Sequence, residues 1–170
     1  MRAINKNNIA VFFVIGILML SFSSQQPTGR TGAPGDGLCT DCHANNGSFG
    51  ADITLSGIPS NPDPNTTYDV TIDVDVTSGS PVRSGFSMVS LDNSNDEQAG
   101  DWSNPGSGSN LRNANDREYF GHNPAQNFSG GNVSWEAEWT APNLTDDVTF
   151  YIAVNLANGS GTAGERILVM

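Results

Sequence analysis

The sequence predicts an all-β protein: an antiparallel, immunoglobulin-like sandwich preceded by an N-terminal segment of different character. In several runs, apolar and polar residues alternate with a period of two, which is typical of strands with one buried face. Clusters of Gly, Pro and Asn separate these runs and favour turns. The apolar stripe of an amphipathic helix is absent, so the strands are expected to pair into two packed sheets. A β-barrel is the alternative closure of the same strands.

The chain begins with the features of an export signal. Arg2 and Lys6 precede residues 9–22, an apolar run that is too short for a comfortable membrane span and typical of a signal peptide. We expect residues 1–23 to be a signal peptide, cleaved near Ser23. The rest would then be exported to the periplasm, the cell surface or the exterior. An uncleaved segment that anchors the protein is the alternative, and it is the only membrane contact expected.

The remainder of the chain is strongly acidic. It is long enough for one domain with a core of its own. All 18 acidic residues lie in it, against five arginines. Such a surface repels nucleic acid and anionic lipid, so we expect no nucleic-acid partner. The charge serves either solubility or docking to a basic partner.

Two regions are expected after the signal. Residues 24–48 form an N-terminal segment that carries both cysteines of the chain. The Gly- and Pro-rich part of this segment, residues 25–38, is expected to be extended. Residues 49–170 form the sandwich domain. Residues 92–114 interrupt it as a polar loop, functional or disordered. The strands are expected around the following residues: Ile53 and Leu55; Tyr68 to Val76; Phe86 and Met88; Glu118 to Gly121; Val133 to Trp139; Val148 to Leu156; and Ile167 onward.

The motif Cys39–Thr40–Asp41–Cys42–His43 predicts covalent attachment of haem. A two-residue spacer lets two thiols reach the two vinyl groups of one porphyrin. The histidine that follows, His43, can then supply an imidazole to the iron, which is ordinary haem ligation. An exported protein fits this chemistry, because bacterial haem c attachment takes place outside the cytoplasmic membrane.

Three other interpretations of the two cysteines stay open. A zinc site would need four ligands, and beyond this motif the chain offers only one more histidine. A thioredoxin-like redox pair would precede a helix, whereas strands are expected here. A structural disulfide between Cys39 and Cys42 would close a very short loop and stabilise little.

His122 is the expected second axial ligand of the iron. It follows an aromatic-rich strand, and we expect Gly121 to let a flat ring approach the backbone and Pro124 to fix the turn. Met88 and Met170 are the other possible ligands, with core packing the expected role of Met88. A histidine on a surface loop is the alternative for His122. Ligation by two histidines, in an acidic protein, predicts a low reduction potential.

The chain resembles a family of exported Bacteroidota proteins in which a haem-attachment motif is fused to a reelin-like (Reeler, choice-of-anchor V) β-sandwich. The resemblance rests on GRTGAPGDGLCTDCHANNG, TYDVTIDV, SGFSMVSLD, REYFGHN, VSWEAEWTAP and VTFYIAVNLANGSGTAGERI. It implies an immunoglobulin-like sandwich and a monohaem c-type cytochrome of the cell envelope or exterior. It also implies a haem contact by the histidine at position 122.

We therefore expect a non-enzymatic electron carrier with one covalent haem c. Cys39 and Cys42 would hold the haem, and His43 and His122 would ligate the iron. Its partner would be a redox protein, a neighbouring haem protein or further copies of itself. One alternative is a haem enzyme or sensor with an open distal site, where His122 acts as an acid or base. The other is a surface binding or structural module that uses the loop at residues 92–114.

Overall fold

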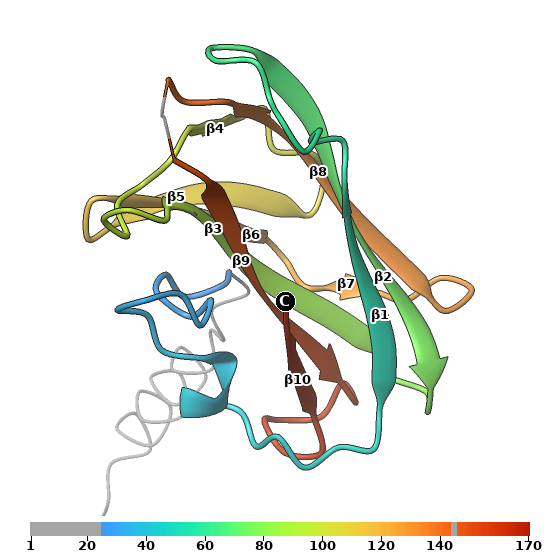
Figure 1. The fold of residues 1–170 in the computed structure, drawn as a ribbon. Helices are drawn as coiled ribbons and strands as arrows, with labels where there is room; N and C mark the ends of the chain where they lie inside the picture. The colour runs from blue at the N-terminus through green and yellow to red at the C-terminus, as the bar shows by residue number, and fades with distance from the viewer. Residues whose placement is uncertain (1–24, 144–145) are drawn as a thin grey trace, which may run out of the picture.

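The period-two alternation of the sequence produces two antiparallel sheets packed face to face (Figure 1). The computed structural model describes residues 25–143 and 146–170. The signal peptide predicted for residues 1–23 lies outside this part of the chain. The described part contains no helix with the length and apolar character needed to cross a membrane. Its strands pair antiparallel throughout, which confirms the predicted fold class.

The first sheet has four strands in the order β1-β2-β8-β4. Its long strands alternate as predicted: in β2, Val70, Ile72 and Val74 are fully buried, while Asp69 and Asp75 are exposed. Within residues 25–143 and 146–170, no second layer covers that side, so the exposed residues face solvent. The strand bounds are β1 (Gly50–Ser56), β2 (Thr67–Ser78), β8 (Asn132–Thr140) and β4 (Asp101–Ser103).

The second sheet has the order β10-β9-β3-β6-β5, and the short strand β7 also pairs with β3. Six of the seven expected strands match β1, β2, β3, β6, β8 and β9, and the seventh, expected from Ile167 onward, is the short strand β10. The strand bounds of this sheet are β10 (Arg166–Val169), β9 (Val148–Ala157), β3 (Arg83–Asp92), β6 (Arg117–His122), β5 (Ser109–Ala114) and β7 (Gln126–Asn127).

Aromatic side chains dominate the core between the sheets. Phe86 contacts Phe120 edge to face at a ring-centroid distance of 4.9 Å and Trp135 at 4.5 Å. Trp139 packs edge to face on Phe150 at 5.0 Å. Such pairs add to the free energy of burial through their ring geometry. Met88 is fully buried in this core, as expected for its packing role.

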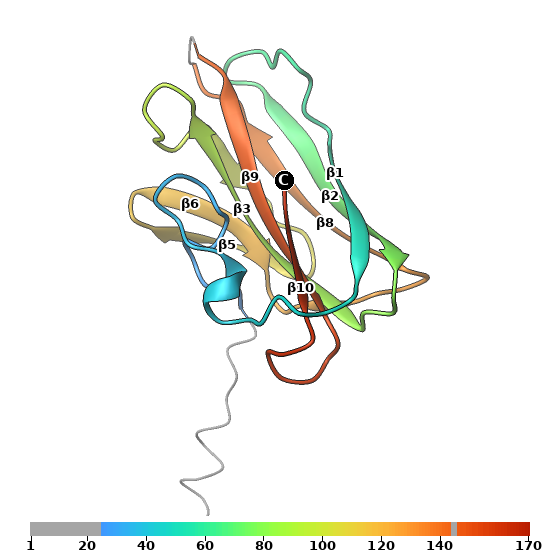
Figure 2. The same cartoon turned by 60° about the horizontal axis from the view of Figure 1, so that its bottom comes forward.

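The central strand β3 is buried on both faces, which its sequence alone does not reveal. Phe86 and Met88 face the core, while Val89 and Leu91 pack with Ala33 and other residues in a second apolar cluster. Residues 25–38, called the lead-in below, lie with the motif on the side of the sheet away from β1, β2 and β8 (Figures 1 and 2). The lead-in therefore forms a partial third layer.

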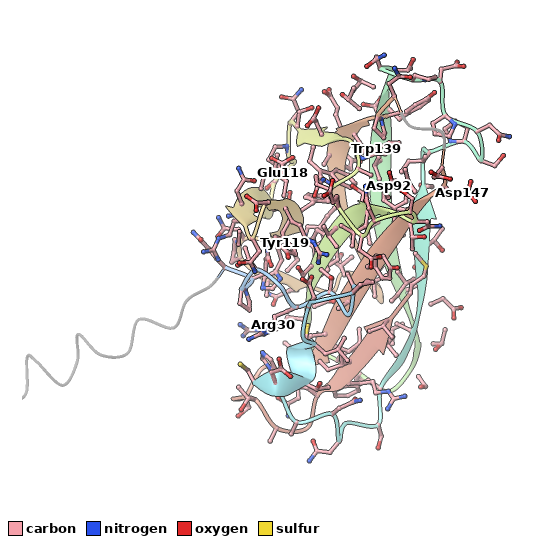
Figure 3. The ribbon with its side chains drawn as sticks, turned by 60° about the vertical axis from the view of Figure 1, so that its left-hand side comes forward. Arg30, Asp92, Glu118, Tyr119, Trp139 and Asp147 are labelled. Carbon is pink, nitrogen blue, oxygen red and sulfur yellow. The ribbon has the colours of Figure 1, made fainter. Side chains whose placement is uncertain are left out.

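The lead-in turns back on itself instead of running extended. Thr31 and Leu38 form an antiparallel bridge, and the Gly32 amide donates to the Gly37 carbonyl at 3.0 Å. The loop is fixed to β6 by polar contacts, since Asp36 accepts hydrogen bonds from Tyr119 at 2.9 Å and from Arg117 at 3.0 Å. Tyr119 lies beside this loop in Figure 3. Few apolar side chains were needed because a buried carboxylate supplies the anchor.

The expectation of a polar loop at residues 92–114 is wrong. This segment contains β4 and β5, and Trp102 in β4 is 4 % exposed. β5 lies at the sheet edge and pairs with β6 along its whole length, from Ser109↔His122 to Ala114↔Arg117. An edge strand needs backbone pairing and little apolar alternation, so its polar sequence concealed it.

Candidate functional site

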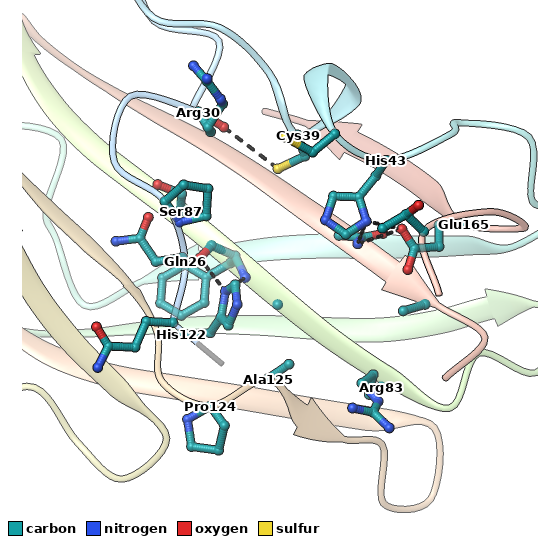
Figure 4. A pocket seen from close by; sticks show the side chains of 18 of the residues that line it. Gln26, Arg30, Cys39, His43, Arg83, Ser87, His122, Pro124, Ala125 and Glu165 are labelled. Atoms are coloured by element: carbon teal, nitrogen blue, oxygen red, sulfur yellow. Dashed lines mark hydrogen bonds and ion pairs between the residues drawn. The ribbon is translucent and has the colours of Figure 1, made fainter. Parts of the chain in front are cut away.

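All four predicted site residues line one cavity. Cys39, Cys42, His43 and His122 surround a space of about 600 Å³, between the outer face of the second sheet and the segment formed by the lead-in and the motif (Figure 4). The volume is within the range of cofactor and small-molecule sites. Three of these residues come from the motif and the fourth from the end of β6, about eighty positions later. Only the folded sandwich brings them together.

Cys39 begins a single turn of 3₁₀-helix, η1 (Cys39–Asp41), and Cys42 caps its C-terminal end. The Cys39 carbonyl accepts hydrogen bonds from the amides of Cys42 at 3.2 Å and His43 at 3.0 Å. This turn places two side chains three residues apart on one side of the backbone. Both cysteines are free thiols, so the structure contains no disulfide between them. Both thiols can therefore react with a molecule bound in the cavity.

The two thiols differ in environment. Cys42 is exposed, whereas Cys39 is partly buried, with its thiol 3.7 Å from the Arg30 carbonyl. Burial is the main cause that raises the pKa of Cys39 to about 11, since it disfavours the thiolate. The buried thiol is consequently a weak nucleophile at neutral pH.

His43 is held by residues from the far end of the chain. Its Nδ1 contacts a carboxylate oxygen of Glu165, and the same oxygen accepts a hydrogen bond from Nδ2 of Asn155 at 3.1 Å. The backbone that follows the motif is fixed to the same loop, because the Gly47 amide donates to the Glu165 carbonyl at 2.7 Å. Figure 4 shows His43 and Glu165 side by side at the cavity. The orientation of His43 thus depends on the loop before β10.

His122 is seated against β3 at the end of β6. Its Nδ1 lies 2.9 Å from both the amide nitrogen and the carbonyl oxygen of Phe86. A Cβ at Gly85 would stand 2.7 Å from the imidazole, so the glycine is what lets the ring lie on the strand. Burial lowers the pKa of His122, and proximity to His43 lowers it further against the Phe86 hydrogen bond. The ring is therefore neutral near pH 7, the form that binds a metal.

The role expected for Gly121 is wrong. A Cβ at Gly121 would meet the side chain of Gln26 at 2.2 Å, so this glycine accommodates a glutamine of the lead-in rather than a flat ring. Gln26 is 1 % exposed, and neither of its side-chain polar atoms has a hydrogen-bond partner. Since Gln26 also lines the cavity, its amide is free to bond a molecule bound there.

Unpartnered polar atoms concentrate around this cavity. Seven residues of the described chain carry buried side-chain polar atoms without a partner, and four of them line the cavity: Gln26, Arg30, Ser87 and Asn155. Buried polar groups are normally hydrogen-bonded, so such a cluster is typical of a site whose ligand supplies the missing bonds.

Two arginines add positive charge to the cavity wall. Arg30 and Arg83 both line it, although the chain has few cations and a net charge of −11. Figure 4 shows them at opposite sides of the opening. Guanidinium groups suit carboxylates, and a porphyrin carries two propionates, so the charge of the wall matches this kind of ligand.

The structure places Met88 and Met170, the alternative ligands to His122, away from the cavity. Met88 is enclosed between the sheets, and Met170 pairs through its backbone with Ile152 at the end of the last strand. Neither lines the cavity. Among the described residues, no three His, Cys, Asp or Glu side chains converge into a metal-binding group.

Sequence reasoning missed Glu165, Asn155, Gln26 and Gly85. Glu165 lies in a Gly-rich turn without periodicity, and its partner His43 is 122 residues away. Asn155 is a polar residue within the apolar run of β9. This interruption is a signal in the sequence that could have marked it as a site residue.

No family model matches the chain, and no curated protein matches it. The structure is similar to a crystal structure of the human F-spondin reeler domain, with 15% identity over 73% of this chain and 91% of that chain, at a TM-score of 0.44. It is similar to the Reelin-N domain of F-spondin, with 16% identity over 74% and 87%, at 0.46. A DUF4466 family protein from Parabacteroides merdae shows 11% identity over 74% and 44%, at 0.42. The fold class follows from the strand pairing itself, and these structures are similar to the chain in fold alone.

Proposed function

We propose that the protein is an exported monohaem c-type cytochrome that carries electrons. The observation that carries the proposal is the convergence of Cys39, Cys42, His43 and His122 on one cavity. The motif residues are adjacent in the sequence, whereas His122 comes from the end of β6. Their meeting in one space of suitable size is independent support for a shared ligand.

The residues of the cavity fit haem c by their chemistry. Cys39 and Cys42 are free thiols able to form two thioethers, and His43 and His122 each offer an imidazole nitrogen. His122 is oriented through its Nδ1 by the Phe86 backbone, which leaves the Nε2 for a ligand. When bound, haem supplies a one-electron couple of the iron.

The protein's own contribution would be to hold the haem, screen it from water and set its reduction potential. The lead-in covers one side of the cavity and the outer face of the second sheet covers another, so the site is partly screened from water. Arg30 and Arg83 provide partners for carboxylates. The acidic surface favours the oxidised, more positive iron, which lowers the reduction potential. A redox protein, a neighbouring haem protein or further copies of the chain would exchange the electron.

The experiment is expression in a bacterium with an active periplasmic haem c maturation system, followed by intact-mass measurement and a pyridine haemochrome spectrum. We expect a mass gain of one haem in the wild type and none in the Cys39→Ser/Cys42→Ser variant. The ferric protein should be low-spin by electron paramagnetic resonance. In His122→Ala the haem should remain attached while the low-spin signal is lost. A wild type without haem, in a host that loads a control cytochrome, would refute the proposal.

The same measurements test the alternatives. A high-spin ferric spectrum that responds to cyanide would identify an open coordination position, as in a haem enzyme or sensor. The second candidate is a binding module that holds a small ligand without covalent attachment. The unpartnered side-chain amide of Gln26 at the cavity favours it. A haem-free exported protein that copurifies with a small molecule would support this second function.

A further inference from the structure

Glu165 is a nearly buried acidic residue at the cavity wall, and the proposed attachment of haem does not require it. Its side chain is 3% exposed, and the residue stands directly before β10. Its backbone bridges to Asn45 and accepts a hydrogen bond from Gly47. These bonds tie the segment after the motif to the C-terminal loop, so the carboxylate is held in place beside His43.

The contacts of the Glu165 carboxylate favour one tautomer of the His43 ring. One carboxylate oxygen, Oε2, faces Nδ1 of His43 and accepts from Nδ2 of Asn155. Nδ2 of Asn155 can only donate, and one carboxylate oxygen can accept from it and from an Nδ1–H of His43 at the same time. The contacts therefore fit a His43 ring that carries its proton on Nδ1. The Nε2 of His43 then carries the lone pair.

We infer that Glu165 is a positioning residue that fixes the metal-binding tautomer of His43 and lowers the reduction potential of the centre. The inference rests on the proposed function and deepens it. A carboxylate on the far nitrogen of a ligating imidazole increases the basicity of the ligand. Within the described chain, no arginine lies within ion-pair distance of the Glu165 carboxylate, whose charge faces only the neutral ring of His43. The uncompensated charge stabilises the more positive ferric state.

Asn155 supports the same arrangement from β9. Its Nδ2 donates a hydrogen bond to the Glu165 carboxylate at 3.1 Å, while its 3.4 Å separation from Nδ1 of His43 is no hydrogen bond when Nδ1 carries the proton. The carboxylate is consequently held from two elements, the loop before β10 and the central part of the second sheet.

The first test uses haem-free protein and nitrogen NMR of the histidine rings. We expect His43 to carry its proton on Nδ1 in the wild type and in Glu165→Gln, whose amide oxygen still accepts a hydrogen bond. In Glu165→Ala the His43 ring should shift toward the Nε2–H tautomer. An unchanged tautomer in Glu165→Ala would overturn the assignment of Glu165 as the positioning group.

The second test uses haem-loaded protein and redox titration. Glu165→Gln keeps the size and the acceptor but removes the charge. We expect its equilibrium constant for reduction to rise about tenfold, or about 59 mV for one electron. Glu136→Gln on the outer face of β8 removes the same charge far from the site and is the matched control. Equal potentials in the two variants would refute the tuning role. A wild type without haem would instead refute the proposed function, and the NMR result would still decide the tautomer.

Discussion

At the scale of single residues, the motif at positions 39–43 gives its two cysteines unequal chemistry. Cys42 is exposed, while burial raises the pKa of Cys39 to about 11. A thiol reacts as the thiolate, so the buried cysteine is protected in the haem-free protein. The folded form also keeps a proton that the unfolded form releases above about pH 9. Its contribution to stability is therefore complete below that pH and is lost as the pH rises toward 11.

This difference predicts the order of chemical modification. In haem-free wild type at pH 8, iodoacetamide should label Cys42 first, and labelling of Cys39 should become fast only near pH 11 or after unfolding. Peptide mass spectrometry over a time course measures both rates. The urea-unfolded protein is the control, because its two thiols should react at similar rates. Equal rates in the folded protein would contradict the burial of Cys39.

At the scale of elements, the carboxylate of Asp36 ties the lead-in to the sheet. The side chain of Asp36 is 3% exposed and accepts hydrogen bonds from Arg117, Tyr119 and Thr31. Arg117 itself is 14% exposed in its side chain. Because removal of one partner leaves a buried charge unpaired, this contact is worth far more than a surface ion pair.

We expect Asp36→Asn to lower the free energy of unfolding by about 3 kcal/mol. Urea unfolding of the haem-free protein measures this value, and limited proteolysis should then cut within residues 25–38. Asp41→Asn is the control, since Asp41 pairs with Arg30 at 3.5 Å in a half-exposed position and should cost less than about 1 kcal/mol. Similar costs for both variants would mean that Asp36 does not anchor the lead-in.

The predictable and unpredictable elements differ in a physical way. β2 and β8 could be predicted because Val70 to Val74 and Val133 to Trp139 alternate over a half-buried surface. β5 could not, because an edge strand is specified by its neighbour and carries polar residues. In the site, Cys39, Cys42 and His43 follow from local spacing. The contact between His43 and Glu165 is purely tertiary, so no local pattern announces it.

At the scale of the whole molecule, negative charge gathers on the outer face of the first sheet. Asp69 lies directly opposite Glu138, and Asp52 lies opposite Asp75. Like charges in directly opposed positions destabilise a sheet. The stability of the protein should therefore increase with ionic strength, because salt screens exposed charges.

We expect Asp69→Asn to stabilise the protein by about 0.5 kcal/mol at low ionic strength and to reduce the effect of added salt. Thermal unfolding at several concentrations of sodium chloride measures both effects. Thr67→Asn, on the same exposed face of β2, changes no charge and is the matched control. A variant with unchanged salt dependence would show that the repulsion between Asp69 and Glu138 is negligible.

The contact of His43 with a residue 122 positions later implies an order of assembly. The motif precedes every strand of the sandwich in the sequence. Its two thiols are therefore next to each other in the chain before any sheet has formed. His122 and Glu165 reach the cavity only after long-range strand pairing, which is slow because distant segments must meet. Under the proposed function, haem would be attached to the unfolded chain, and folding of the sandwich would then bring His122 and Glu165 to it.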